Sequence, residues 1–241
     1  MTLIFLRLLL AHILADFIFQ SNKMVAEKQD KKIASKRLYL HILFHILFYY
    51  LLLWDLELWY IPLAIGLSHY FIDLGKLYLQ NKNNIRLLFF LDQALHLIVL
   101  YGASLYISGG DLWQFTLNSQ LLLVLVLVLF LAQPASVIIK TLISIYTPKT
   151  EMEKEDSLQN AGKYIGMLER FLVFVFIASN HWEGVGFLIA AKSIFRFSDL
   201  TQAKDRKLTE YILIGTLLSF GLAIICGLIF LYMFPRILRG L

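Results

Sequence analysis

The chain has 241 residues, of which 59% are hydrophobic and only 16% are charged, and its formal net charge is +5. Its mean hydropathy is +0.70. This composition is typical of an integral membrane protein and argues against a string of soluble domains. The positive charge does not indicate nucleic acid as a partner, because most basic residues lie in short loops between apolar runs, where they would set topology and contact anionic lipid headgroups. We therefore expect the lipid bilayer to be the partner.

The apolar runs predict an all-α fold, a polytopic transmembrane helical bundle with seven or eight membrane segments. The expected spans cover residues 2–20, 38–54, 58–79, 87–107, 119–146, 161–180, 184–197 and 210–234. Segment 184–197 is short for a helix that rises about 1.5 Å per residue across a core of about 30 Å. The count is therefore eight if this segment crosses the membrane and seven if it does not.

The loop after the first span sets the predicted orientation. Residues 21–37 contain six basic side chains, and basic loops stay in the cytoplasm. We therefore expect a multi-pass protein of the inner (cell) membrane with its N-terminus outside. Residues 1–107 are expected to form a four-span bundle rich in histidine and aspartate, and residues 108–241 to be accessory spans packed on it within one membrane domain.

Each of the first four spans carries two titratable residues spaced four apart. The pairs are His12 with Asp16, His41 with His45, His69 with Asp73, and Asp92 with His96. This spacing places both members on one helix face, about 6 Å apart along the axis. Because successive spans run in opposite directions, the three aspartates and His41 fall in one layer near the cytoplasmic surface. The other four histidines lie one turn deeper, so the sequence predicts one cluster shared by four helices.

Imidazoles and carboxylates in this number form the ligand set of a transition-metal site. An unpaired Asp near mid-bilayer costs roughly 2.5–3.5 kcal/mol on insertion scales, whereas a structural zinc site returns about 10–16 kcal/mol. We therefore expect all eight residues to bind one or two divalent ions, first of all zinc, with manganese or iron as alternatives. Asp16, Asp73 and Asp92 are also candidate catalytic groups, because a carboxylate that does not bind metal can act as a general base. A metal-free proton or ion pathway and simple polar packing between helices stay open as alternatives.

Four further residues are candidates for substrate binding. Gln20 lies one turn beyond Asp16 and is placed to hydrogen-bond a ligand of the site. Lys192 and Arg196 are four residues apart and form one basic face that could hold a phosphate headgroup. Alternatively, they could pair with Glu169 and join two helices through an ion pair.

Six segments carry a family resemblance: LLLAHILADFIFQ, HILFH, LSHYFIDLGK, DQALH, GKYIGMLERFL and KSIFRF. In this order they resemble an uncharacterised family of bacterial multi-span membrane proteins defined only as a domain of unknown function. More distantly, the His/Asp pairs look like those of the membrane-bound metal-dependent hydrolases. That second resemblance implies a metal hydrolase acting on a lipid-borne ester or phosphodiester.

Three functional hypotheses follow. The first is an integral membrane metal-dependent hydrolase whose substrate is a phospholipid or a polyprenyl phosphate. The second is a transporter or channel for divalent metal or protons that uses the same residues. Residues 46–53 and 97–101, in the outer halves of two spans, carry no charged group, which argues against a continuous polar route. The third is a structural membrane subunit whose bundle is stabilised by metal.

Overall fold

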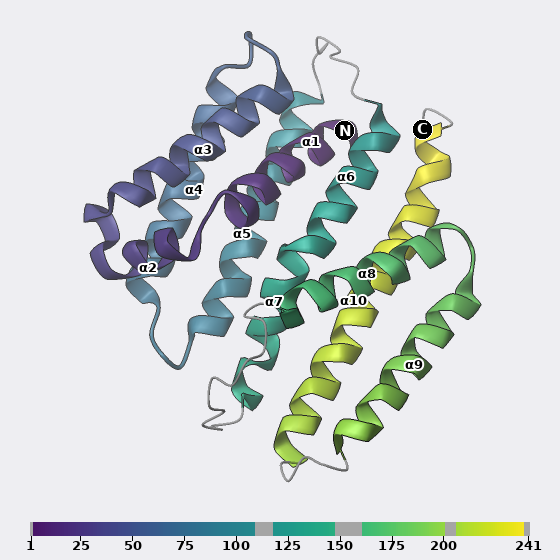
Figure 1. Ribbon diagram of the computed structural model, residues 1–241. Coiled ribbons are helices and arrows are strands. Elements are labelled where there is room, and N and C mark those ends of the chain that lie inside the picture. The colour runs from purple at the N-terminus through teal and green to yellow at the C-terminus, as the bar shows by residue number, and fades with distance from the viewer. Residues whose placement is uncertain (1, 109–117, 148–160, 201–205, 239–241) are drawn as a thin grey trace. The chain divides into compact units, whose positions relative to one another are not determined.

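The computed structural model describes residues 2–108, 118–147, 161–200 and 206–238 (Figure 1). Within these ranges the chain consists of helices joined by turns, without a strand, which confirms the all-α prediction. The chain divides into two compact units, residues 1–126 and 127–241. We call them unit 1 and unit 2.

Unit 1 is built on a bundle of four helices with a short polar helix beside it. Its helices are α1 (Thr2–Ile13), continued by a π-helical turn (Leu14–Ile18), α2 (Asn22–Lys31), a 3-10 turn (Lys32–Ala34), α3 (Lys36–Leu53), α4 (Tyr60–Leu79) and α5 (Ile85–Ile107). Helix α1 packs on α3 and α5, and α4 packs on the same two helices. The four long helices therefore enclose a common interior. Helix α6 (Ser119–Ala132) begins in unit 1 and ends in unit 2.

The helices of the bundle have a buried stripe and an exposed apolar face. On α3 the buried stripe repeats about every four residues and comprises Leu38, His41, His45, Tyr49 and Leu53. The opposite face exposes Leu43, Leu47 and Leu51. A large exposed apolar face is costly in water but is solvated by lipid tails. The surface of α3 therefore suits a membrane environment.

The interior of unit 1 is apolar at one end and polar at the other. The apolar end contains aliphatic side chains from all four long helices and one tyrosine: Ile4, Leu8, Ala11, Tyr49, Leu53, Ile61, Ile65, Leu100 and Ile107. Further along the same helix faces, the buried positions are occupied by histidines and aspartates. The fold thus places the polar side chains of four helices around one point.

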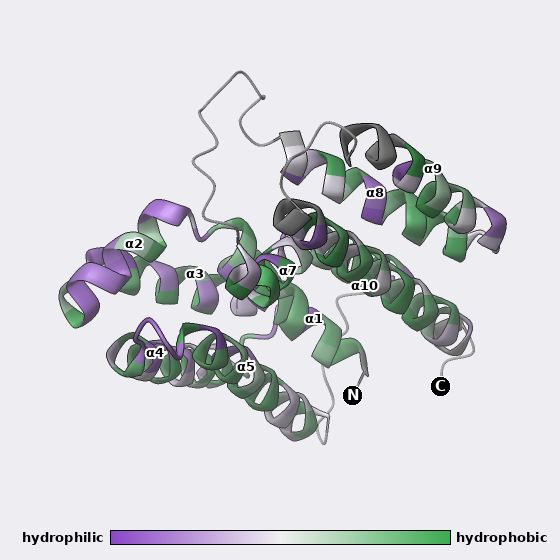
Figure 2. Cartoon of the chain, turned by 90° about the horizontal axis from the view of Figure 1, so that it is seen from below, coloured by the Kyte–Doolittle hydropathy of each residue, from purple (hydrophilic) through white to green (hydrophobic). Residues whose placement is uncertain are grey.

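The segment after α1 differs from the predicted cytoplasmic loop. The chain bends by 82° between residues 3–18 and 22–34, and Ser21 caps α2 by accepting a hydrogen bond from the Met24 N–H. Helix α2 is largely hydrophilic (Figure 2). It nevertheless packs on α3 and buries Met24 and Lys28. A stretch that the sequence predicts to be a cytoplasmic loop is therefore part of the packed unit.

Fewer helices qualify as membrane spans than the seven or eight predicted. Among the described residues, four segments are long and apolar enough: Lys36–Leu53, Ile85–Ile107, Ser119–Tyr146 and Glu210–Pro235. The bent pair of α1 and α2 would be a fifth. Helix α4 falls short because it carries His69, Asp73 and Lys76, and α8 and α9 each contain three or more charged residues. The four or five spans are consistent with a membrane protein.

Unit 2 contains α7 (Pro134–Ile143), a 3-10 turn (Ser144–Tyr146), α8 (Ala161–Ala178), α9 (Trp182–Leu200) and α10 (Arg206–Leu238). Helix α10 packs on α7 and α8, and α9 packs on α8. Pro134 marks the break between α6 and α7, because proline has no N–H to donate and fits best in the first turn of a helix.

One buried cation lies at this interruption. The Arg170 guanidinium donates from Nε to the Leu131 carbonyl at 2.7 Å and from Nη2 to the Ala132 carbonyl at 3.3 Å. It also donates to the hydroxyls of Ser136 and Ser219, at 2.6 and 3.2 Å. Arg170 therefore finds acceptors for its donors within unit 2, next to the break between α6 and α7.

Candidate metal centre

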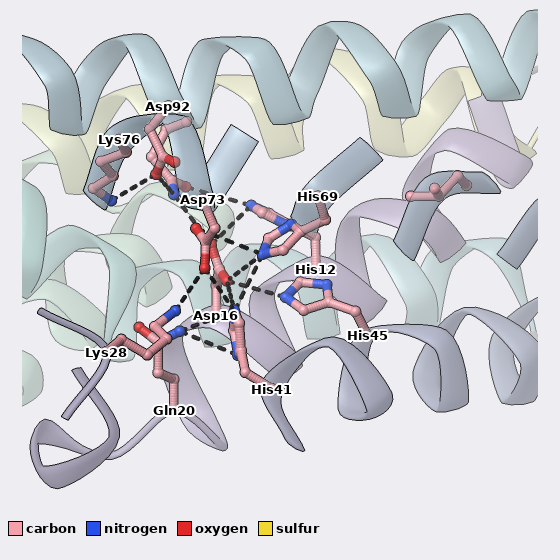
Figure 3. A network of polar contacts seen from close by, with 12 residues as sticks. His12, Asp16, Gln20, Lys28, His41, His45, His69, Asp73, Lys76 and Asp92 are labelled. Atoms are coloured by element: carbon pink, nitrogen blue, oxygen red, sulfur yellow. Dashed lines mark hydrogen bonds and ion pairs between the residues drawn. The ribbon is translucent and has the colours of Figure 1, made fainter. Parts of the chain in front are cut away.

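All eight residues predicted as metal ligands meet inside unit 1, and Figure 3 labels each of them except His96. They come from α1 and its π-helical turn, α3, α4 and α5. The side chain of Asp16 is 8% exposed, and the other seven residues are at most 6% exposed. The one-turn spacing of the four pairs thus leads to a single buried cluster.

Asp16 lies at the centre of the cluster. Its Oδ1 atom is 3.0 Å from His45 Nε2, 3.1 Å from His41 Nε2 and 3.4 Å from His69 Nε2. The Nε2 atoms of His41 and His69 are themselves 3.1 Å apart. A carboxylate oxygen offers about two lone pairs, and of two imidazole nitrogens in contact only one can donate. The three imidazoles therefore cannot all donate to Asp16 Oδ1.

The same distances fit a bound cation. In a tetrahedral zinc site, bonds of 2.0–2.2 Å place neighbouring ligand atoms about 3.3–3.6 Å apart. Asp16 Oδ1, His41 Nε2 and His69 Nε2 form a triangle with sides of 3.1, 3.1 and 3.4 Å. Two overlapping sets of ligand atoms, each within 4.8 Å of one another, surround it: His12, Asp16, His45 and His69 in one, and His41, His69 and Asp73 in the other. These residues have the chemistry and the spacing of a divalent-metal site.

The helix that carries Asp16 is irregular at this residue. Residues Leu14–Ile18 form a π-helical turn, and the Phe19 N–H donates back to the Leu14 carbonyl. Such turns are rare and frequently lie at functional sites. Asp16 Oδ2 still lies 3.6 Å from His12 Nε2, while Oδ1 is among imidazoles of α3 and α4. Nothing in the residue pattern distinguishes this turn from a regular helix.

Two lysines that the sequence did not assign to the site contact its aspartates. Lys28 Nζ donates to Asp73 Oδ2 at 2.6 Å, and Lys76 Nζ donates to Asp92 Oδ2 at 2.8 Å. Lys76 follows Asp73 by three residues on α4, so the helical spacing already contained a signal for it. Lys28 had no such signal, because its burial depends on the packing of α2.

Two glutamines add hydrogen bonds around the cluster. Gln93, not identified from the sequence although it follows Asp92 directly, donates to Asp16 Oδ2 at 3.1 Å and to Asp92 Oδ2 at 3.2 Å. Its Oε1 lies 3.3 Å from His12 Nε2. The Gln20 amide nitrogen lies 2.9 Å from His41 Nε2, so Gln20 contacts a candidate ligand. Its role in substrate binding stays a prediction.

Several buried atoms of the cluster lack partners among the described residues. They are His12 Nδ1, His45 Nδ1, Asp92 Oδ1 and both ring nitrogens of His96. The His96 ring stacks on His69 with centroids 3.9 Å apart. A buried polar atom without a hydrogen bond costs about 1–3 kcal/mol, and native proteins contain few of them. These residues could therefore hold an ion.

The second group of predicted residues lies in unit 2. Lys192 Nζ donates to Glu169 Oε2, which is the ion pair between helices that the sequence left open as an alternative. Arg196 belongs to α9, but its side chain lies outside the described part of the chain. A phosphate-binding role for these residues stays a prediction.

The fold and the site define an all-α protein with several helices of membrane-spanning composition and a buried His/Asp cluster suited to a metal ion. The chain belongs to the family described as "Protein of unknown function (DUF3307)", whose model matches residues 4–124. This match confirms the resemblance to an uncharacterised domain family, and the matched segment contains all eight candidate ligands. No curated protein and no solved structure matches the chain. The likeness to membrane-bound metal-dependent hydrolases stays a prediction.

Proposed function

We propose that this protein is an integral membrane metal-dependent hydrolase that acts on a lipid-linked ester or phosphodiester. The observation that carries the proposal is the approach of three imidazole Nε2 atoms to within 3.0–3.4 Å of one carboxylate oxygen, Asp16 Oδ1. Nitrogen-rich sites of this kind favour zinc, with manganese or iron as alternatives.

The residues of the cluster suit hydrolysis. A divalent cation supplies Lewis acidity, which polarises a carbonyl or phosphoryl oxygen and makes water a better nucleophile. Asp73 Oδ2 lies 3.7 Å from His41 Nε2, so Asp73 borders the candidate metal position. Lys28 and Lys76 neutralise two of the three carboxylate charges. An anionic phosphate ester would therefore meet less repulsion than the aspartates alone would cause.

The packing of α4 supports a topology with more membrane crossings than helix length and composition alone indicate. Helix α4 packs between α3 and α5, which both qualify as spans. We propose that α4 also crosses, with its polar residues directed into the bundle, and that α1 does the same. The lysines of α2 and its flanking residues would then keep the cluster end of unit 1 at the cytoplasmic face of the inner membrane, with the N-terminus outside. Unit 2 would supply the accessory spans.

Transport of metal or protons has less support. A transport route would need polar groups from the cluster to the other end of the bundle. The stripes that carry His45, His69 and His96 continue instead into Tyr49, Ile65 and Leu100, all buried in the apolar core. The third hypothesis is that the metal only stabilises the bundle. The buried atoms without partners do not support it, whereas inactivity of the metal-loaded protein would.

The test uses the full chain purified in detergent. The protein is stripped with a chelator, reloaded with Zn²⁺ or Mn²⁺, and incubated with phospholipids and polyprenyl phosphates while product release is measured. We expect metal-dependent hydrolysis that His45→Ala abolishes. His181→Ala is the matched control, because His181 is exposed and its ring contacts Ser179 in a turn of unit 2. Accumulation of metal in proteoliposomes without any hydrolysis would replace the proposal with transport.

A further inference from the structure

We infer that the cluster contains a second metal position, formed by Asp73, Asp92 and His96, and that the centre is dinuclear. This inference rests on the proposed function, since it assigns a second ion to the same site. The three residues each offer a ligand atom, and these atoms all lie within 4.8 Å of one another. The set is distinct from the triangle of Asp16, His41 and His69.

Two members of this second set, Asp92 and His96, carry buried atoms that lack partners in the described part of the chain. Asp92 and His96 are both 3% exposed, and Asp92 Oδ1 and both His96 ring nitrogens have no hydrogen-bond partner among the described residues. Asp73 Oδ1 lies 3.9 Å from His69 Nε2, which is too long for a hydrogen bond. A cation shared by these atoms would satisfy a carboxylate oxygen from each aspartate and one imidazole nitrogen together.

The two lysines hold the carboxylates in position for this role. Lys28 occupies Oδ2 of Asp73, and Lys76 occupies Oδ2 of Asp92 (Figure 3). Charge-assisted hydrogen bonds are short and orient the group that accepts them. In metal sites, partners of this kind orient the ligands and are needed for full affinity. Lys28 and Lys76 are therefore positioning residues that leave each Oδ1 atom for a cation.

The two metal positions differ in ligand chemistry, and their proximity suits a particular class of substrate. Around Asp16 the ligands are mostly imidazoles, which suit zinc, whereas two carboxylates and one imidazole suit a harder ion such as Mn²⁺. His69 and Asp73 also belong to a shared ligand set with His41, so the two positions are adjacent. Paired divalent ions contact both the attacking and the leaving oxygen in displacement at phosphorus. A dinuclear centre therefore suits a phosphate ester as the substrate.

The test is a metal titration of the full chain in detergent, with Mn²⁺ as the probe. Isothermal calorimetry of the stripped wild type should show two equivalents, and electron paramagnetic resonance should show two exchange-coupled ions. Asp92→Asn and His96→Gln, which nearly preserve size, should each bind one equivalent with an uncoupled spectrum. His181→Ala should behave as the wild type.

The outcomes separate this inference from the proposed function. If the wild type binds one uncoupled ion, the second metal position is wrong. If Asp92→Asn retains that ion, the metal position at Asp16 stands. A wild type that binds no metal overturns both proposals. The wild-type spectrum decides the question even where a variant fails to fold, because it reports coupling between ions without any substitution.

Discussion

Units 1 and 2 both bury charged side chains among apolar helices, but the two units differ in the hydrogen bonds that they offer these side chains. In unit 2 the guanidinium of Arg170 donates to two carbonyls and two hydroxyls of its own unit. In unit 1 three aspartates and five histidines lie together, two lysines pair with two of the aspartates, and five buried nitrogen or oxygen atoms of the cluster have no partner among the described residues. Burial of charge is common to both units, whereas incomplete hydrogen bonding distinguishes unit 1.

The difference separates a structural polar group from a binding site. Arg170 stabilises the helix break at Pro134 because acceptors are already present, so no ligand is needed. The cluster of unit 1 holds more acceptors and imidazoles than its neighbours can satisfy, and a cation would resolve this imbalance. Substitutions in the two units should therefore have different consequences, and four of them test the comparison.

The largest effect on stability is expected from Lys28→Met in the metal-free protein. The change leaves Asp73 buried without its ammonium partner, and breaking a buried ion pair costs about 3–5 kcal/mol. Metal should recover less stability in this variant than in the wild type, because Lys28 orients Asp73 and its loss weakens metal binding. Thermal unfolding in detergent, with chelator and then with Zn²⁺, measures both effects. Lys31→Met, on the exposed side of α2, is the control, and an unchanged metal-free melting temperature in Lys28→Met would contradict the buried pair.

Arg170→Met should destabilise the protein without changing its metal content. The substitution leaves the carbonyls of Leu131 and Ala132 without their side-chain donor, at an expected cost of about 2–4 kcal/mol. Chemical unfolding reports the stability, and elemental analysis below the unfolding transition reports the metal. Lys163→Met, an exposed change on the same helix, should alter neither. Loss of metal from folded Arg170→Met would contradict the expectation that Arg170 and the cluster act independently.

Gln93→Leu should weaken metal binding by about tenfold without removing it, because outer partners of ligands typically contribute 10–100-fold to affinity. Gln93 donates to two candidate ligands, Asp16 and Asp92. Competition with a chelator of known affinity measures the change. The control is Gln29→Leu, on the exposed surface of α2, which should bind metal as the wild type does. An unchanged metal affinity in Gln93→Leu would show that Gln93 does not support the ligands.

Lys192→Met should have the smallest effect. Its pair with Glu169 is partly exposed, with side-chain exposures of 27% and 18%, and such pairs contribute about 0–1 kcal/mol. The melting temperature should therefore change little. A clear loss of lipid-phosphate hydrolysis at unchanged stability would instead favour the phosphate-binding role that the sequence pattern suggested for Lys192.

The sequence predicted the helices and the cluster because both depend on local periodicity. The span expected at residues 87–107 corresponds to α5, Ile85–Ile107, and that at 38–54 to α3, Lys36–Leu53. The spacing of His12 with Asp16 and of His69 with Asp73 placed these side chains on common faces. Helical period and polarity were sufficient for these features.

Other features depend on tertiary packing and were missed. The lysine-rich segment after α1 reads as a solvated loop, yet α2 packs on α3 and buries Lys28. The π-helical turn at Asp16 has no signature in the residue pattern. More spans were predicted than the four or five segments that are long and apolar enough, because apolar runs were counted despite the charged residues in α8 and α9. A one-dimensional pattern contains neither the contacts of a polar helix nor its depth in a membrane.

The central claim, a metal ion bound at Asp16, is tested most directly by elemental analysis of the detergent-purified wild type beside Asp16→Asn. The substitution preserves the shape of the side chain but removes the charge at the oxygen that three imidazoles approach. We predict at least one equivalent of zinc, manganese or iron in the wild type and a loss of metal in the variant. A wild type without metal, or an Asp16→Asn protein that retains its full metal content, would contradict the account.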